Sequence, residues 1–318
     1  MSAHKIYLDC DPGIDDALAI GYLLAAEDVD LLGIGTVSGN TNAAQGATNA
    51  LALLELAGRT EVPVAVGSND FLHGNYDGGA PHVHGARGAG AAELPAPSAS
   101  PVEESAVDML LRLSHDHAGE LHIIAVGPLT NIARAVEKDP TLPRRVARVT
   151  IMGGAALVPG NVSQAAEANI KHDPEGAQVV FGAPWDITVV PLDVTLTNTF
   201  EEEDRQALAA SGQFGRHVAE MLDYYFQFYV GFYGRRAAAL HDPLAAAIAV
   251  EGISAAVAPI VRVRVDCTTG TQRGRVICDL PSDVPVESIP DTPGANVAVV
   301  LRTTSDLAPQ LREALVSL

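Results

Sequence analysis

Four aspartates crowd one short stretch of the chain. The segment YLDCDPGIDDALAI places Asp9, Asp11, Asp15 and Asp16 within eight positions, where a strand-like apolar run meets a helix-like run. Two carboxylates about 4 Å apart repel by roughly 4 kcal/mol at an effective dielectric constant near 20. A helix N-terminus stabilises each acidic side chain placed there by only about 0.3–1 kcal/mol. Helix capping therefore does not account for four of them, and the pattern indicates protonated carboxyl groups or a bound cation.

The ligand type indicates which cation fits. Hard carboxylate oxygens favour Ca²⁺ or Mg²⁺ over zinc, and we expect Ca²⁺ because it accepts mixed carboxylate, carbonyl and water ligands in loose geometry. An EF-hand does not fit, since counting from Asp9 puts Ile14 at the turn glycine and Ile20 at the twelfth-position glutamate. A DxDxT phosphatase is also disfavoured, because Gly13 stands where that motif has threonine.

Short β-rich runs alternate with Ala- and Leu-rich runs on both sides of this cluster. KIYLDC and VDLLGIGTVSG are typical of strands, whereas DDALAIGYLLAAE and NAAQGATNALALLELAG carry apolar residues three and four apart, as helices do. The alternation resumes from ELHIIAVG to DITVVPLDV. This order predicts an α/β fold with a doubly wound, mostly parallel sheet. Such sheets bind ligands beyond the carboxyl ends of their strands, which is where the aspartates fall.

Three further segments complete the expected architecture. Residues 69–101 are rich in Gly, Pro, His and Ala, which is typical of an active-site flap or a disordered segment. The pattern near residues 200–250 predicts a helical insertion with three helices. IVRVRVDCTTGTQRGRVICDL predicts a C-terminal hairpin around residues 270–274. No repeat or linker composition interrupts the chain, so we expect a single domain over residues 1–318.

Composition limits the partners. With 318 residues, 47% of them hydrophobic, the chain can bury a large core, and its net charge of −19 repels nucleic acids and anionic lipids. The first residues lack a signal-peptide pattern, and no apolar run approaches the roughly 20 residues of a membrane span. Three cysteines without a CxxC pair fit a reducing compartment. We therefore expect a cytoplasmic protein with no nucleic-acid and no membrane partner.

The aspartate segment closely resembles the DxDPGxDDxxAI fingerprint of the nucleoside hydrolases, calcium-dependent enzymes that cleave the N-glycosidic bond of ribonucleosides. Five further blocks stand in the same order as in that family: GTVSGN, VGPLTNIA, IMGGA, GNVSQAAEANIKHDPEGA and LHDPLAAA. They extend from near residue 7 to beyond residue 250. The resemblance implies a ribonucleoside as the small-molecule substrate, Ca²⁺ as the cofactor, and a homodimer or homotetramer.

The resemblance also implies binding roles for individual residues. The carboxylates of Asp11, Asp16 and Asp242 and the backbone carbonyl of Val126 would bind Ca²⁺. Asp15 would hold the ribose 2′-hydroxyl, and Asp9 would bond loop N–H groups and orient its neighbours. Such a site rejects 2′-deoxyribose, because the missing hydroxyl leaves buried groups unpaired. The other sugar contacts would come from Asn40, Met152, Asn161, Glu167 and Asn169, with Met152 beneath the ribose.

Two residues would carry the reaction. Asp11 would activate a Ca²⁺-bound water that attacks the anomeric carbon of an oxocarbenium-like sugar. His241 would protonate the departing base, a role that contributes about 10²–10⁴ in rate. Without the resemblance, His241 is equally well explained as a helix histidine whose ring is satisfied by a carbonyl.

The contacts with the nucleobase are less defined. Tyr225, Tyr229 and Tyr233 lie four apart on one helical face, which is typical of core packing, yet the resemblance places this region beside the base pocket. His82 and His84 fall in the 69–101 loop, either against substrate or as two solvated side chains. We take Tyr229 and His84 as the candidate base contacts, and the sequence gives no base preference.

Two departures from the family leave the predicted metal ligands unchanged: Ala168 is small where some relatives carry an aromatic, and Cys10 needs no redox role.

Two alternative functions remain open from the sequence. One is a hydrolase of the same fold that acts on a modified ribosyl compound. The other is a calcium- and sugar-binding protein without turnover, although simple binding has no need of a base beside the metal.

Overall fold

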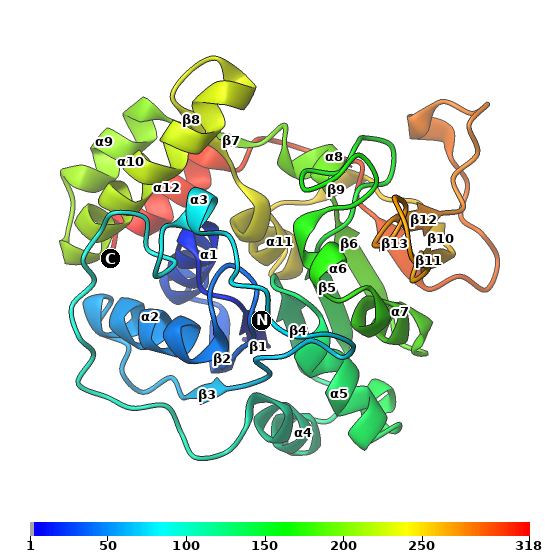
Figure 1. Cartoon of the computed structure of the whole chain (residues 1–318), viewed down its shortest axis with the longest axis horizontal. Coiled ribbons are helices and arrows are strands. Elements are labelled where there is room, and N and C mark those ends of the chain that lie inside the picture. The colour runs from blue at the N-terminus through cyan, green and yellow to red at the C-terminus, as the bar shows by residue number, and fades with distance from the viewer. Residues whose placement is uncertain (1–2) are drawn as a thin grey trace.

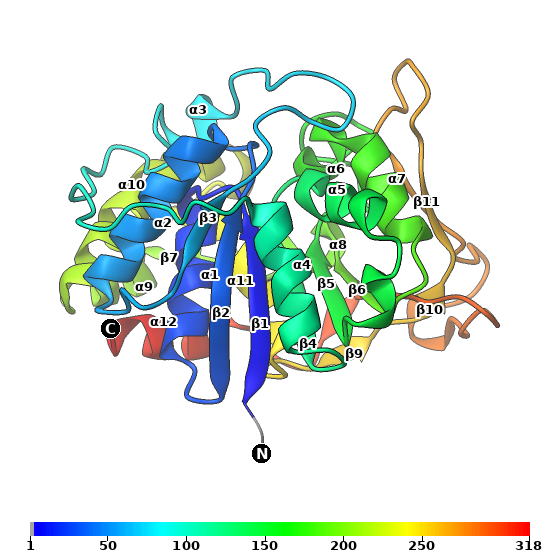
Figure 2. The ribbon, with the colours of Figure 1, turned by 90° about the horizontal axis from the view of Figure 1, so that it is seen from below.

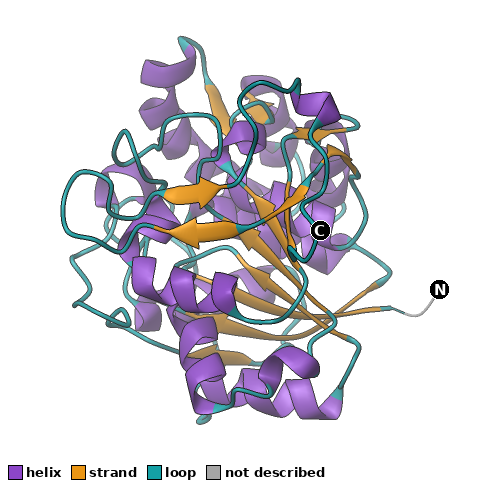
Figure 3. Cartoon of the chain, turned by 90° about the vertical axis from the view of Figure 1, so that its right-hand side faces the viewer, coloured by secondary structure: helices purple, strands orange, loops and turns teal. Residues whose placement is uncertain are grey.

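The computed structural model describes residues 3–318, and its centre is an eight-stranded sheet. Neighbouring strands are parallel except for the outermost pair, β10 and β13, which is antiparallel. The predicted α/β fold with a mostly parallel sheet is therefore confirmed (Figures 1 and 3). The order across the sheet is β10 (Ile260–Val261), β13 (Val297–Val299), β6 (Ile187–Val190), β5 (Arg148–Met152), β4 (Leu121–Ala125), β1 (His4–Cys10), β2 (Val29–Thr36) and β3 (Val64–Val66).

Helices cover both faces of the sheet, and each face has its own apolar core (Figure 2). Successive residues of β1 divide between the two cores: Ile6 and Leu8 pack on one side and Tyr7 on the other, as the two-residue period of a strand requires. One face carries α1 (Ile14–Ala25), α2 (Ala43–Leu56), α9 (Glu202–Ala209), α10 (Gln213–Tyr233), α11 (His241–Ala249) and α12 (Ala308–Val316). The other carries α4 (Ala106–Asp116), α5 (Thr130–Lys138) and α7 (Pro174–Gly182).

The order of strands reverses between β1 and β4. From β1 the chain proceeds outward through β2 and β3, and from β4 it proceeds in the opposite direction through β5 and β6. In open α/β sheets the connections diverge at such a point and border a crevice at the carboxyl ends of the strands, where ligands bind. Asp11 directly follows β1 and Val126 directly follows β4, so the two chain segments that border the crevice carry two predicted metal ligands.

The predicted helical insertion is present, with one correction. Strand β8 (Ala237–Ala239) pairs antiparallel with β7 (Thr199–Glu201), whereas the sequence predicts a helix that begins at Ala238 and continues through the residues that follow. These three alanines are fully buried. Pairing with β7 gives their buried backbone N–H and C=O groups hydrogen-bond partners. The helix starts only at His241, with Pro243 in its first turn, where proline is tolerated.

The predicted C-terminal hairpin is also present but shorter than expected. Its strands are β11 (Val263–Val265) and β12 (Val276–Cys278), whereas β10, which we placed in the same strand, joins the edge of the main sheet instead. Cys267 and Cys278 are both free thiols. Two short strands, β9 (Ala255–Val257) and β14 (Arg302–Thr303), pair separately, and 3₁₀ turns occur at Leu142–Arg144 and Val286–Ser288.

The long loop of residues 69–101 contains one helical turn, α3 (Pro81–His84), which lies close to α10 (Figure 1). Two more short helices, α6 (Ala168–His172) and α8 (Leu192–Thr195), follow β5 and β6. No helix within residues 3–318 combines the length and apolar character needed to cross a bilayer. That the whole chain forms a single domain stays a prediction.

Candidate active site

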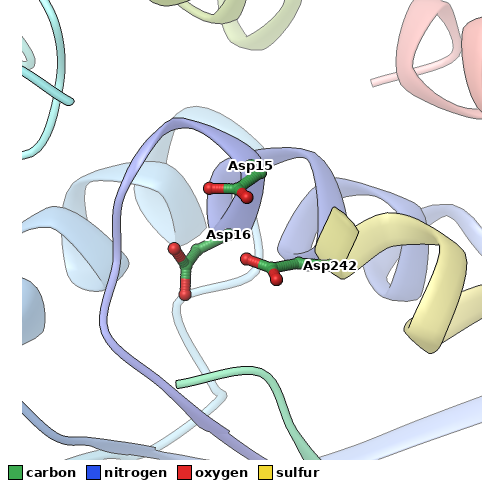
Figure 4. A group of neighbouring side chains, drawn as sticks. All are labelled: Asp15, Asp16 and Asp242. Atoms are coloured by element: carbon green, nitrogen blue, oxygen red, sulfur yellow. The ribbon is translucent and has the colours of Figure 1, made fainter. Parts of the chain in front are cut away.

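Aspartates from three parts of the chain meet at the crevice. Asp11 comes from the end of β1, Asp15 and Asp16 from the first turn of α1, and Asp242 from the first turn of α11. Figure 4 shows the last three side chains grouped together, from two helices that pack against each other. Both helices present their N-termini to this group, and the partial positive charge there favours carboxylates.

The closest group of carboxylate oxygens differs in one member from the predicted ligand set. Asp15, Asp16 and Asp242 each offer an oxygen within 4.8 Å of the others, whereas Asp11 lies beside this triplet. Asp11 Oδ2 accepts a hydrogen bond from Asn40 N at 2.6 Å, and Asp16 Oδ1 accepts one from Asp11 N at 3.1 Å. A Cβ at position 39 would fall 2.0 Å from Asp11 Oδ2, so only glycine allows this close approach.

Several carboxylate oxygens lack a protein partner. Asp9 Oδ1, Asp11 Oδ1 and Asp15 Oδ1 are buried without a hydrogen bond. Unpaired buried charges of one sign are costly unless a counter-charge meets them. An all-oxygen donor set with free lone pairs fits Ca²⁺ or Mg²⁺, and the Val126 carbonyl can join it. That carbonyl already accepts Asn169 Nδ2 at 2.8 Å and keeps a second lone pair.

Burial and mutual repulsion act on the protonation of the aspartates. Burial raises the pKa of Asp11 and Asp242 well above the ordinary value, and the neighbouring carboxylates raise it further. Burial also raises the pKa of Asp15 to about 6 and that of Asp16 to about 7. A bound divalent cation opposes each of these effects, because it favours the ionised carboxylates.

Asp9 lies beneath the cluster and bonds side chains rather than the loop N–H groups that we expected. Its Oδ2 accepts hydrogen bonds from Tyr7 Oη and Asn131 Nδ2, both at 3.0 Å. Asn131 also donates to Thr36 O at 3.0 Å and accepts from Ser68 N at 2.8 Å. This buried amide, which we did not single out in the sequence, therefore ties together the ends of β1 and β2 and the segment that follows β3. It belongs to the quoted block VGPLTNIA, which was the available signal.

His241 is buried on the other side of the cluster, between two hydroxyl groups. Its Nε2 lies 2.7 Å from Tyr229 Oη, and its Nδ1 lies 2.8 Å from Thr195 Oγ1. The alternative of a ring satisfied by a backbone carbonyl is therefore wrong. Burial lowers the pKa of His241 to about 3, so the neutral imidazole is the resting form. We did not anticipate Thr195, because a single threonine in PLDVTLTN carries no signal that the sequence alone reveals.

The other two tyrosines of the helical face point to different places. Tyr225 Oη donates to Asp15 Oδ2 at 3.2 Å and meets the ring of Tyr229 edge to face at 4.9 Å. Tyr233 Oη donates to Leu196 O at 2.9 Å, which is a packing role. Tyr225 and Tyr229 thus form an aromatic wall that runs from the aspartates to His241.

His84 belongs to this wall. Its side chain is buried, its Nδ1 accepts a hydrogen bond from Ile14 N at 3.1 Å, and its ring lies 5.3 Å from that of Tyr225. The idea that both loop histidines are solvated is therefore wrong for His84, whereas His82 is exposed. A Cβ at position 13 would lie 2.6 Å from His84 Nδ1, so Gly13 permits the contact.

The predicted sugar contacts lie near the metal candidates, with one exception. Asn40 Nδ2 donates to Asp16 Oδ2 at 3.2 Å, and Asn169 Nδ2 lies 3.4 Å from the sulfur of buried Met152. The buried Glu167 caps α6, where its carboxylate accepts three backbone N–H groups, from Gly154, Asn169 and Ile170. Asn161 is exposed and accepts from Ala168 N at 3.0 Å, so it supports the start of α6.

Comparisons with known proteins show the family to which the chain belongs. The family profile described as "Inosine-uridine preferring nucleoside hydrolase" matches residues 6–309. A probable uridine nucleosidase 2 of Arabidopsis thaliana is 40% identical over 241 residues, which are 75% of this chain and 75% of that protein. A solved plant nucleoside hydrolase is 34% identical with a TM-score of 0.87 and covers 99% of this chain and 98% of its own. A purine-preferring ribonucleoside hydrolase from Gardnerella vaginalis is 30% identical with a TM-score of 0.87, covering 98% and 97%.

Divalent ions should stabilise the fold, because they bind the native cluster and not the unfolded chain. Adding Ca²⁺ to chelator-treated protein at about 100 times the dissociation constant should raise the free energy of unfolding by about 2.7 kcal/mol. Thermal melts with and without Ca²⁺ measure the effect. Asp242→Asn should weaken the response, whereas Asp116→Asn, at an exposed position on α4, should not. Equal melting temperatures with and without Ca²⁺ or Mg²⁺ would rule out a metal site here.

Proposed function

Because the chain belongs to the inosine-uridine preferring nucleoside hydrolase family, we propose that this cluster of aspartates and the facing His241–Tyr229 pair are its active site. As a nucleoside hydrolase, the protein cleaves ribonucleosides to free base and ribose, which sets aside a binding protein without turnover. The assignment rests on a buried group of aspartates that lies where the strand order of the sheet reverses. Facing this group, the hydroxyl of Tyr229 lies 2.7 Å from the imidazole of His241.

Ca²⁺ is the metal that we propose. The family is metal-dependent, and the ligands would be the carboxylates of Asp11, Asp16 and Asp242 and the carbonyl of Val126. When bound, the ion supplies positive charge beside the sugar hydroxyls and lowers the pKa of a nearby water. Asp15, whose Oδ1 has no partner, would accept a hydrogen bond from the ribose 2′-hydroxyl.

The remaining sugar contacts that we propose are Asn40, Met152, Asn161, Glu167 and Asn169. Asn169 and Met152 touch each other at the end of β5, so they can form one floor beneath the ring. Glu167 and Asn161 would act from the loop before α6. Since Glu167 already accepts three backbone N–H groups, it would use its remaining lone pairs for a sugar hydroxyl.

Asp11 is the proposed base. Its Oδ1 is buried and unpaired, and it can accept the proton of the attacking water while Oδ2 stays fixed by Asn40 N.

His241 and Tyr229 would activate the leaving base from the opposite side. The resting imidazole is neutral, so donation toward the departing base begins as a hydrogen bond rather than as a transfer from an imidazolium. His84 and Tyr225 would contact the same base through their ring faces and edges.

Uridine is the base preference that we propose, supported by the name of the 40% identical plant relative. A modified ribosyl compound remains the alternative substrate. The predicted homodimer or homotetramer and the cytoplasmic location also stay proposals.

Ribose release separates these substrates. A reducing-sugar assay with Ca²⁺ present should give the highest kcat/KM with uridine, and lower values with cytidine, inosine and adenosine. An equal or higher value with inosine would overturn the proposed preference. Absence of ribose from all four would point to the modified ribosyl compound.

Asp11→Ala should abolish turnover, because it removes both the proton acceptor and a metal ligand. Steady-state ribose release is the measurement, and Ca²⁺-dependent melting of the same variant distinguishes loss of the base from loss of the metal. Asp28→Ala, at an exposed turn before β2, is the control and should retain full activity. Activity above a few per cent in Asp11→Ala would exclude Asp11 as the base.

His241→Ala should lower kcat for uridine and inosine by about 10²–10⁴, because those leaving groups need a donor. A nitrophenyl riboside has a leaving group that departs without one, so its kcat should change little. Comparison of the two substrate classes in one variant is the measurement. Equal losses on both would show that His241 does something other than assist the base.

A further inference from the structure

Thr195 is a fully buried residue whose hydroxyl meets the imidazole of His241. Thr195 Oγ1 lies 2.8 Å from Nδ1, on the side of the ring opposite Tyr229. The inference that follows rests on the proposed role of His241 in activating the leaving base. It concerns which of the two ring nitrogens carries the proton.

The fold fixes this contact through the backbone. β7 and β8 pair with Thr199 opposite Ala239, which brings the residues before β7 beside those after β8. Leu240 N donates to Asn198 O at 2.9 Å, and Asn198 N donates to Thr195 O at 3.2 Å. The residue that precedes His241 is thus tied through a single peptide turn to Thr195. The pair cannot separate without breaking buried backbone hydrogen bonds.

Within residues 3–318, the hydroxyl of Thr195 has one hydrogen-bond partner, which is His241 Nδ1. If Nδ1 carried the proton and donated to Oγ1, the hydroxyl hydrogen would have no acceptor. Leaving a buried donor unsatisfied costs about 1–3 kcal/mol. If instead the threonine O–H donates to Nδ1, the neutral ring carries its proton on Nε2, and every group of the pair is satisfied.

The tautomer of His241 also determines the direction of its hydrogen bond with Tyr229. An Nε2–H group donates to Tyr229 Oη, which also has the hydroxyl of Tyr225 as a hydrogen-bonding neighbour. The O–H of Tyr229 is then not committed to the imidazole and is available to the base. In the opposite tautomer the tyrosine would donate to Nε2, and neither side chain would offer a donor to the base.

We propose that Thr195 is a positioning residue that holds His241 in the Nε2–H tautomer, so that three donors point in sequence toward the leaving base. The order is Thr195 O–H to His241 Nδ1, His241 Nε2–H to Tyr229 Oη, and Tyr229 O–H to the departing base. Each step is a hydrogen bond, and no covalent bond or redox change is involved.

Two substitutions at position 195 and one nearby control test the proposal. Thr195→Val keeps the shape and removes the hydroxyl, whereas Thr195→Ser keeps the hydroxyl. Thr197→Val is the control, because Thr197 Oγ1 donates to Val194 O at 2.8 Å and does not contact His241. Thr195→Val should lower kcat for uridine by about ten- to a hundredfold, with KM changed little, because His241 is then no longer held in the Nε2–H tautomer.

The same variant should turn over a nitrophenyl riboside at nearly the wild-type rate. Thr195→Ser should restore most of the uridine activity, and Thr197→Val should match wild type on both substrates. Unchanged uridine turnover in Thr195→Val would overturn the proposal. So would equal losses on both substrates, because a purely structural role would produce them.

The tautomer can be measured without turnover. In protein labelled with ¹⁵N-histidine, the ring resonances of His241, identified by their loss in His241→Ala, should show a protonated Nε2 and an unprotonated Nδ1. Thr195→Val should shift this balance. A protonated Nδ1 in the wild type would overturn the proposal even if His241 is essential. Full uridine turnover in His241→Ala would defeat the proposed function instead, and the spectrum would still report on Thr195.

Discussion

Burial of several like charges at one end of two adjacent strands is the constraint on which the rest of this structure depends. Asp11, Asp16 and Asp242 are almost fully excluded from water, and two helix N-termini offset only part of their repulsion. The surroundings are arranged to tolerate the ionised forms. Backbone N–H groups and an amide donate to some oxygens, whereas Asp11 Oδ1 is buried without a protein partner. A compact acidic pocket of this kind is stable with an added cation and strained without one.

The sequence predicts the sheet and the acidic cluster well, because both follow from local patterns. Strand and helix periods differ, and the aspartates stand next to a strand end. The predictions fail where tertiary pairing decides. Ala238 and Ala239 are predicted in a helix, since alanine favours helices, yet pairing with β7 places them in a strand. Ile260 and Val263 read as one strand, yet they belong to different sheets.

The same difference between local patterns and tertiary contacts decides which site residues the sequence predicts. Residues 15 and 16 are adjacent in the chain, so their meeting was foreseeable, whereas Asp242 was placed only by resemblance to a family. His84 could not be assigned from GGAPHVHGARG, because nothing local tells whether a loop histidine turns inward. Its burial depends on the missing side chain of Gly13, seventy-one residues earlier. The sequence does not indicate Thr195 for a similar reason, because its contact with His241 arises only from the pairing of β7 with β8.

The pocket has a consequence for how such proteins diverge. The groups that we propose for the sugar stand on the ends of central strands and on the helices that follow them, and Asn131 locks three of these segments together. The groups that we propose for the nucleobase come from a peripheral loop and from α10, which pack beside that framework. Substitutions in the periphery can therefore retune which base is accepted while the glycosidic chemistry is inherited unchanged. A single scaffold can in this way supply salvage enzymes of different substrate range.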